Sequence, residues 1–318
     1  MAQRRQEPWA RYQWRRLWRH LAWLRTQGLA RLIEEDNLNP LQRASRAVAG
    51  WRWRQVHQAR PGAATAVFVV GLQRSGTNML VRGLERDPRF QVYNENHRAA
   101  FNRFRLRPDP VIRQLVERSR HPYVLFKPLC DAHRTADLLD GLQLHPAPRA
   151  VWAYRSVDGR ARSAVAKFGD TNLRMLRDLA AGGGQDRWEA QRLSPDSLQL
   201  IASIDWAAGS PYDAAAMFWY VRNRLYFELG LAERPDVLLV SYDAMLADPR
   251  AEMGRICRFL DLPFDPRLVA HVEGRRGGGE ARLEIHPRIR ERCDELAARL
   301  DAARRTVPTR PVGGEVGR

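Results

Sequence analysis

The sequence predicts an α/β fold, a three-layer sandwich in which a central parallel sheet of about five strands is flanked by helices. Short apolar runs alternate with helical patterns from about residue 65 onward, and a glycine-containing loop follows the first run. The expected strands are Ala66–Gly71, Phe90–Asn94, Tyr123–Phe126, Ala150–Tyr154 and Val237–Val240. Helices are expected near residues 76–86, 109–118, 131–140, 157–167, 211–230 and 248–260.

Three parts are expected along the 318 residues. Residues 1–60 read as a basic, Trp-rich helical extension, residues 61–305 as one main domain, and residues 306–318 as a disordered tail rich in Pro, Gly and Arg. The turn-forming stretch Arg60–Thr65 marks the first boundary. Residues 168–210 lack a clear period and predict an irregular, mobile cover.

The charge is strongly positive but comes from one residue type. The formal net charge is +17, and of the 53 lysines and arginines only Lys127 and Lys167 are lysines. So lopsided a ratio indicates the codon bias of a GC-rich, bacterial genome. Residues 1–60 alone carry a net +9, so the main domain is only mildly basic. The charge therefore does not by itself predict nucleic-acid binding, and none is expected.

The cysteines and the hydropathy pattern favour a cytoplasmic protein. Cys130, Cys257 and Cys293 are widely spaced and odd in number, so they form neither a disulfide framework nor a C-x-x-C metal pair. No signal peptide is visible, and no run approaches the ~20 apolar residues that span a bilayer.

Residues 9–31 predict an amphipathic helix with a basic side, because tryptophans and leucines recur among arginines at spacings near three and four. Packing of the Trp/Leu stripe on the main domain is the first interpretation. The alternative is peripheral attachment to the inner face of the membrane, with tryptophans at the headgroup level.

The loop "GLQRSGTN", residues 71–78, follows the first strand and opens the first helix of the sheet. Its glycines are spaced as in the phosphate-binding G-x-x-x-x-G-K-[ST] loop, but Thr77 stands in place of the lysine. Helix N-termini at the carboxyl ends of parallel strands bind anions. We therefore expect a P-loop-like anion site in which Arg74 supplies the cation. The candidate binding residues are Arg74, Ser75, Gly76, Thr77 and Asn78.

This loop resembles the G-x-x-R-S-G-T-T segment of sulfotransferases that use 3′-phosphoadenosine 5′-phosphosulfate (PAPS), such as the tyrosylprotein sulfotransferases and many bacterial relatives. The resemblance implies that the loop holds the 5′-phosphosulfate. Asn78 replaces the last threonine of that segment.

A second resemblance lies in "VWAYRSVDGRARSAVAKF", residues 151–168. In the family, a strand ends in an arginine, and a serine eight residues later joins it on the 3′-phosphate of the donor. Arg155 and Ser163 match that spacing. An arginine fork and a hydroxyl make a charge-assisted phosphate site.

Two further segments resemble the catalytic parts of the family. Lys127 matches the lysine after the central strand that stabilises the leaving phosphate, whereas Leu129 stands where cytosolic members have a catalytic histidine. The tyrosylprotein sulfotransferases place a catalytic glutamate in the region of Glu95, which makes Glu95 the first candidate base. His97 is the rival, since its ordinary pKa suits a base at neutral pH.

Together the matches extend from about Val67 to Asp265, and Arg275-Arg276-Gly277 faintly resembles an Arg-Lys-Gly element that grips the 3′-phosphate. They imply transfer of a sulfuryl group from PAPS, as co-substrate, to a hydroxyl or amine of an unidentified glycan, lipid, peptide or small metabolite. No metal is expected, because no ligand cluster appears.

Two alternatives stay open at this point. One is a nucleotide-dependent kinase or NTPase, disfavoured by the missing loop lysine. The other is a non-catalytic protein on the same fold that binds anions through its arginines. The arginines of residues 98–107 could serve such a surface or grip an acidic acceptor.

Overall fold

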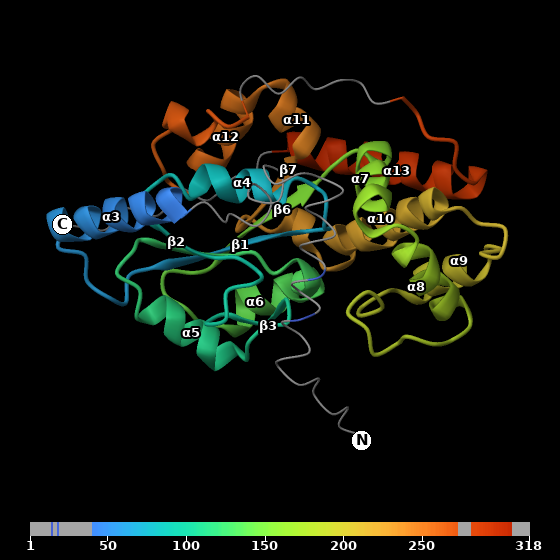
Figure 1. Ribbon diagram of the computed structural model, residues 1–318, viewed down its shortest axis with the longest axis horizontal. Coiled ribbons are helices and arrows are strands. Elements are labelled where there is room, and N and C mark those ends of the chain that lie inside the picture. The colour runs from blue at the N-terminus through green and yellow to red at the C-terminus, as the bar shows by residue number, and fades with distance from the viewer. Residues whose placement is uncertain (1–13, 15–17, 19–39, 273–280, 307–318) are drawn as a thin grey trace. The chain divides into compact units, whose positions relative to one another are not determined.

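A parallel sheet organises the part of the chain that the computed structural model describes (Figure 1). The described residues are 14, 18, 40–272 and 281–306. The chain divides into two compact units, residues 1–53 and 54–318, and the sheet belongs to the second. Helix α3 (Pro40–Val56) begins in the first unit. The predicted Trp-rich helix at 9–31, apart from Trp14 and Trp18, and the predicted tail beyond residue 306 lie outside the described residues.

The sheet has five strands in the order β2-β5-β1-β6-β7, and every pairing is parallel. The strands are β1 (Thr65–Gly71), β2 (Phe90–Tyr93), β5 (Tyr123–Phe126), β6 (Arg149–Tyr154) and β7 (Val237–Ser241). The predicted α/β sandwich is confirmed, and each expected strand lies within one residue of its predicted bounds. Because β1 lies between β5 and β6, the chain turns to opposite sides of β1, and parallel sheets bind ligands at such a switch point.

Alternate residues of β1 face the two helical layers. Val67 and Val69 belong to the apolar cluster on one face, and Phe68 and Val70 belong to the cluster on the other. The first face is covered by α4 (Thr77–Leu84), α11 (Tyr242–Ala247) and α12 (Pro249–Phe259). The second is covered by α5 (Asp109–Glu117), α6 (Thr135–Gly141), α10 (Pro211–Glu228) and α13 (Pro287–Arg305). Figure 1 shows α4 and α12 on one side of the strands and α5 and α6 on the other.

The prediction of an irregular cover at residues 168–210 is wrong in part. This segment contains α8 (Thr171–Ala180) and α9 (Pro195–Ala202), which follow α7 (Val157–Phe168). Leu173, Leu176 and Leu179 recur on one face of α8 and are buried in the core. The short period was hidden by the glycine run that follows α8.

Two other elements gave no clear sequence signal. Residues 131–140 do not form one helix but a 3₁₀ turn, η1 (Leu129–Arg134), followed by α6. The hairpin of β3 (Phe101–Asn102) and β4 (Arg105–Leu106) turns at Arg103 and Phe104, which have φ of 51° and 70°. Left-handed turns of this kind usually carry Gly or Asn, so this sequence did not reveal the hairpin.

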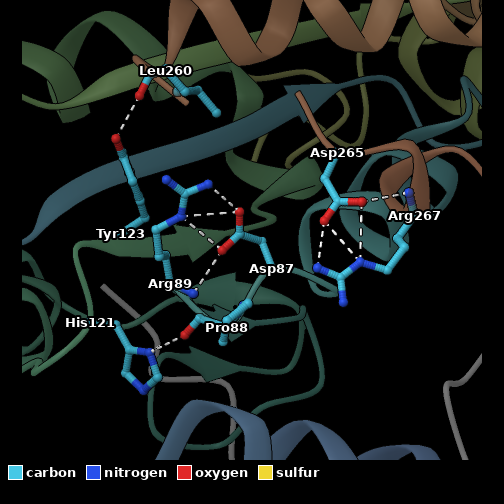
Figure 2. Close-up of polar contacts among 8 residues, drawn as sticks. All are labelled: Asp87, Pro88, Arg89, His121, Tyr123, Leu260, Asp265 and Arg267. Carbon is cyan, nitrogen blue, oxygen red and sulfur yellow. Dashed lines mark hydrogen bonds and ion pairs between the residues drawn. The ribbon is translucent and has the colours of Figure 1, made fainter. Parts of the chain in front are cut away.

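The amino ends of the strands are fixed by polar contacts (Figure 2). Arg89, just before β2, forms a fork on the carboxylate of Asp87, with Nη2 2.6 Å from Oδ2. The hydroxyl of Tyr123, the first residue of β5, donates to the carbonyl oxygen of Leu260 at the end of α12, at 2.6 Å. These contacts hold the sheet at the end opposite to the loop predicted to bind anions.

The N-terminus of α10 offers a test of the fold. Ser210 Oγ accepts from the backbone N of Asp213 at 3.1 Å, and Asp213 Oδ2 accepts from the backbone N of Ser210 at 2.8 Å. Ser210→Ala removes half of this capping box and should lower the free energy of unfolding by about 1 kcal/mol. Urea unfolding followed by circular dichroism measures it. Exposed Ser203→Ala, the matched control, should change it by less than about 0.5 kcal/mol, and equal midpoints for the two variants contradict the assignment.

Candidate active site

The loop between β1 and α4 is held in a space that only glycine fits. Gly71 has φ 125°, and a Cβ there would lie 2.2 Å from the carbonyl oxygen of Ala153 in β6. Gly76 has φ 87°, and its Cβ would lie 2.2 Å from Cδ2 of Tyr242. The glycine spacing noted in the sequence therefore has a steric cause, since the loop packs between a neighbouring strand and an aromatic ring.

The loop ends at a helix N-terminus whose donors suit an anion. Gly76 is the N-cap of α4 and has no side chain that could accept from the first backbone N–H groups of the helix. These N–H groups, at the positive end of the helix dipole, can therefore bind an anion. Ser75 is 1% exposed, and its Oγ has no hydrogen-bond partner among the described residues. Buried hydroxyls without a partner are rare, which indicates that a ligand group completes this loop.

Two of the predicted anion-binding residues meet above the loop. Arg74 has φ 72°, and its Nε donates to Ser163 Oγ at 2.9 Å. Ser163 lies on α7, the helix that follows β6. The contact joins the loop to the helix on which the sequence placed the second phosphate site.

Arg155 directly follows β6 and lies beside the ring of Tyr242. Its guanidinium is 4.4 Å from the ring centroid of Tyr242, the residue that packs on Gly76. Gly159 leaves room for it, because a Cβ there would lie 2.6 Å from Arg155 Nε. The ring thus holds the guanidinium next to the anion loop.

Arg160 is a functional candidate that the sequence did not single out. It is 1% exposed, donates from Nε to the carbonyl oxygen of Gln73 at 3.3 Å and from Nη1 to that of Ala215 at 2.8 Å. Burial, and then the charge of Arg74, lower the pKa of Arg160 to about 9. Among the described residues no acidic group offsets this charge. The available signal was position, since Arg160 lies three residues before Ser163 on one face of α7.

Lys127 and Glu95 meet at the carboxyl ends of the neighbouring strands β5 and β2. Lys127 is 7% exposed, and its Nζ donates to Asn78 Oδ1 at 2.5 Å and lies 3.4 Å from Glu95 Oε2. The backbone N of Lys127 donates to the carbonyl oxygen of Tyr93 at 3.2 Å, which aligns the two strand ends. The ammonium group of Lys127 therefore contacts both the side-chain amide of Asn78 and the carboxylate of Glu95.

The two candidate bases have different surroundings. The side chain of Glu95 is 16% exposed, and burial raises its pKa above the ordinary value against the opposing effect of Lys127. His97 is exposed, its ring lies edge-on against Tyr93 at 4.7 Å between centroids, and its Nδ1 accepts from the backbone N of Ala99. Of the two candidate bases, Glu95 is the one that forms an ion pair with Lys127.

A family model described as the sulfotransferase domain matches residues 64–275. The chain belongs to the sulfotransferase family. The matched range contains all five strands of the central sheet and every candidate site residue from Arg74 to Ser163. Arg275-Arg276-Gly277 lies outside the described residues. The comparison with curated proteins gave no match.

Solved structures of sulfotransferases are similar to the chain at low identity. The sulfotransferase domain from the curacin biosynthetic pathway is 14% identical, with a TM-score of 0.44, and covers 74% of this chain and 98% of its own. The domain from the Synechococcus olefin synthase is 16% identical, with a TM-score of 0.38, and covers 79% and 91%. Mouse sulfotransferase SULT7A1, complexed with PAP, is 15% identical, with a TM-score of 0.41, and covers 76% and 87%.

The described residues contain neither a membrane-spanning helix nor a cluster of metal ligands. No helix there combines the length and apolar character needed to cross a membrane. Nor does any group of three or more His, Cys, Asp or Glu side chains in that part of the chain lie together as a metal site.

Gly71→Ala tests the steric origin of the loop. The new Cβ would meet the backbone of Ala153, which cannot rotate away, so we expect a loss of more than about 2 kcal/mol in the free energy of unfolding. Gly62→Ala is the matched control, because Gly62 also has a positive φ, 93°, but nothing lies within 4 Å of its Cβ. Equal thermal midpoints for the two variants contradict the account.

Proposed function

We propose that this sulfotransferase moves a sulfuryl group from PAPS to a hydroxyl or amine of its acceptor. One observation carries the proposal: the anion loop is backed by Arg160, a buried guanidinium that no acidic group among the described residues offsets. A buried charge without a counterion is costly, so the loop is built to receive a strongly anionic ligand.

The residues around the loop fit a donor with two separate anionic groups. The 5′-phosphosulfate would bind to the backbone amides of the loop and to the side chains of Arg74, Ser75 and Thr77. The 3′-phosphate would bind to Arg155, which stacks on Tyr242, and to Ser163, which contacts Arg74. An ordinary nucleoside triphosphate lacks the 3′-phosphate and would leave the second site empty.

Lys127 and Glu95 have different roles in the transfer: Lys127 acts on the leaving group and Glu95 on the acceptor. When bound, PAPS supplies a sulfuryl group whose bond to the 5′-phosphate breaks as the acceptor atom bonds to sulfur. Lys127 stabilises the negative charge that develops on the leaving phosphate, and Asn78 holds its Nζ at the loop. Glu95 takes the proton of the acceptor hydroxyl or amine, and its raised pKa makes it a better proton acceptor than an exposed glutamate.

The other two functions left open by the sequence have no specific support. Thr77 occupies the place of the phosphate-binding lysine of kinases and NTPases. An anion-binding protein without catalysis would not need the buried ion pair of Lys127 with Glu95. Family membership also favours the transferase.

Glu95→Gln tests the base. It keeps the shape of the side chain but cannot accept the proton, so the rate of sulfuryl transfer should fall about 10²- to 10⁴-fold. Binding of the spent donor, 3′-phosphoadenosine 5′-phosphate (PAP), should be kept. The readout is PAP released from PAPS with a panel of hydroxyl and amine acceptors. His97→Asn is the matched control and should retain activity within about threefold. Loss of transfer in His97→Asn with full activity in Glu95→Gln reverses the assignment.

The pH profile gives an independent readout. The ionised form of Glu95 is the base, so kcat/KM falls as the pH drops through its pKa. Burial raises that pKa, which places the acidic limb above the range of an exposed glutamate. Lys127 opposes this rise, so in Lys127→Met the limb should move to still higher pH. A limb that stays in the same place in Glu95→Gln contradicts the role of Glu95.

A further inference from the structure

A second polar cluster follows Lys127 along the chain and is not used by the donor or by the base. We call it the Arg222 cluster; its members are Arg105, Asp131, His133, Gln191 and Arg222. Asp131 and His133 belong to η1, the 3₁₀ turn that begins two residues after Lys127. The cluster therefore lies at the carboxyl end of β5, on the segment that leads away from the catalytic lysine.

Arg222 is a buried cation with incomplete bonding. It lies on α10, is 3% exposed, and donates from Nη1 to the carbonyl oxygen of Gln191 at 3.0 Å. Its guanidinium is 5.5 Å from the ring centroid of Trp188. Its Nη2 is buried without a hydrogen-bond partner, and within the described residues no carboxylate lies within ion-pair distance of Arg222, although the charges of Glu189 and Glu228 act against the lowering of its pKa by burial. A buried cation with an unpaired N–H lowers the free energy of unfolding unless a ligand binds to it.

His133, in the same cluster, also has a buried polar atom without a hydrogen-bond partner among the described residues. It is 4% exposed, and its Nδ1 is buried with no hydrogen-bond partner among the described residues. Burial and then the positive charge of Arg222 lower the pKa of His133 to about 3, so the imidazole is neutral and its ring can offer one N–H. Arg105, Arg134 and Arg192 act in the same direction.

The nearby aspartate does not serve as the missing counterion. Asp131 Oδ1 accepts from Arg105 Nε at 2.6 Å, and Oδ2 accepts from the backbone N of Leu106 at 2.7 Å. Both oxygens therefore anchor the β3–β4 hairpin. Arg105 Nη2 donates to Gln191 Oε1 at 3.1 Å, and Arg222 of α10 donates to the carbonyl oxygen of the same residue. Gln191 therefore links the hairpin to α10.

The turn η1 connects the Arg222 cluster with the catalytic pair. A backbone hydrogen bond from Leu129, the first residue of η1, acts on the pKa of Glu95. Gln73 of the anion loop donates from Nε2 to Cys130 Sγ at 3.6 Å. The turn that carries His133 therefore contacts both the β1–α4 loop and the proposed base.

Resting on the proposed sulfuryl transfer, we propose that the acceptor carries a carboxylate, which binds to Arg222 Nη2 with His133 as a second donor. A carboxylate offers two acceptor oxygens to these two groups. Because the charges of Glu189 and Glu228 already offset part of the charge of Arg222, a single negative charge suits this site better than a phosphate dianion. Of the arginines at 98–107 suggested by the sequence, Arg105 belongs to this site, held between Asp131 and Gln191.

The test compares acids with their neutral amides as sulfuryl acceptors. Glycolate, 4-hydroxybenzoate and 4-hydroxyphenylacetate are assayed against the corresponding primary amides, with PAP release from PAPS as the readout. At least one acid should exceed its amide in kcat/KM by about tenfold or more, the size of a charge-assisted hydrogen bond. Ratios near one for every pair overturn the proposal.

Arg222→Met assigns the preference to this side chain. It should bring the acid-to-amide ratio close to one, and Arg222→Lys should restore part of the ratio. Arg224→Met, on the same helix but paired with Glu228, is the matched control and should keep the ratio. An unchanged ratio in Arg222→Met overturns the proposal.

Folding and donor binding are measured on the same variants. Arg222→Met should melt no lower than the unaltered protein, because it removes a buried charge that has no carboxylate within ion-pair distance among the described residues. A large loss of stability would mean a structural role. PAP titration separates the two proposals. If PAP does not bind, the proposed function fails, whereas PAP binding without acid preference defeats only the carboxylate site.

Discussion

The narrow passage of the β1–α4 loop between β6 and Tyr242 is the constraint on which the site depends. Gly71 and Gly76 allow this passage because neither has a Cβ to meet the backbone of Ala153 or the ring of Tyr242. Once the loop is fixed there, its amides face the carboxyl ends of the strands. Arg155 then stacks on the ring that packs against the loop.

Buried positive charge surrounds this loop and extends away from it. Arg160 lies behind the loop and Arg222 beyond the catalytic pair, each almost inaccessible to water and neither in an ion pair within the described residues. Lys127 has Glu95 as its partner. Buried cations without an ion-pair partner lower the free energy of unfolding, so their retention is understandable where anionic substrates bind to them.

The local patterns predicted the sheet and the residues of the loop, because a buried strand and a glycine-spaced turn are encoded by neighbours in sequence. The contacts of Arg74 with Ser163 and of Lys127 with Glu95 join residues that the sequence placed in one site but did not pair. Arg222 could not be predicted, since a buried arginine looks like a solvated one in a chain so rich in arginine. The β3–β4 hairpin was missed because its turn lacks the usual residues.

Calorimetric titration with 3′-phosphoadenosine 5′-phosphate, beside ATP and 5′-AMP, tests the central claim most directly. The account predicts that the unaltered protein binds this bisphosphate more tightly than either other nucleotide without added metal, and that Arg155→Ala loses the advantage of the 3′-phosphate by tenfold or more, as expected for a charge-assisted contact. Equal binding of all three nucleotides, or a preference for ATP with magnesium, would contradict it.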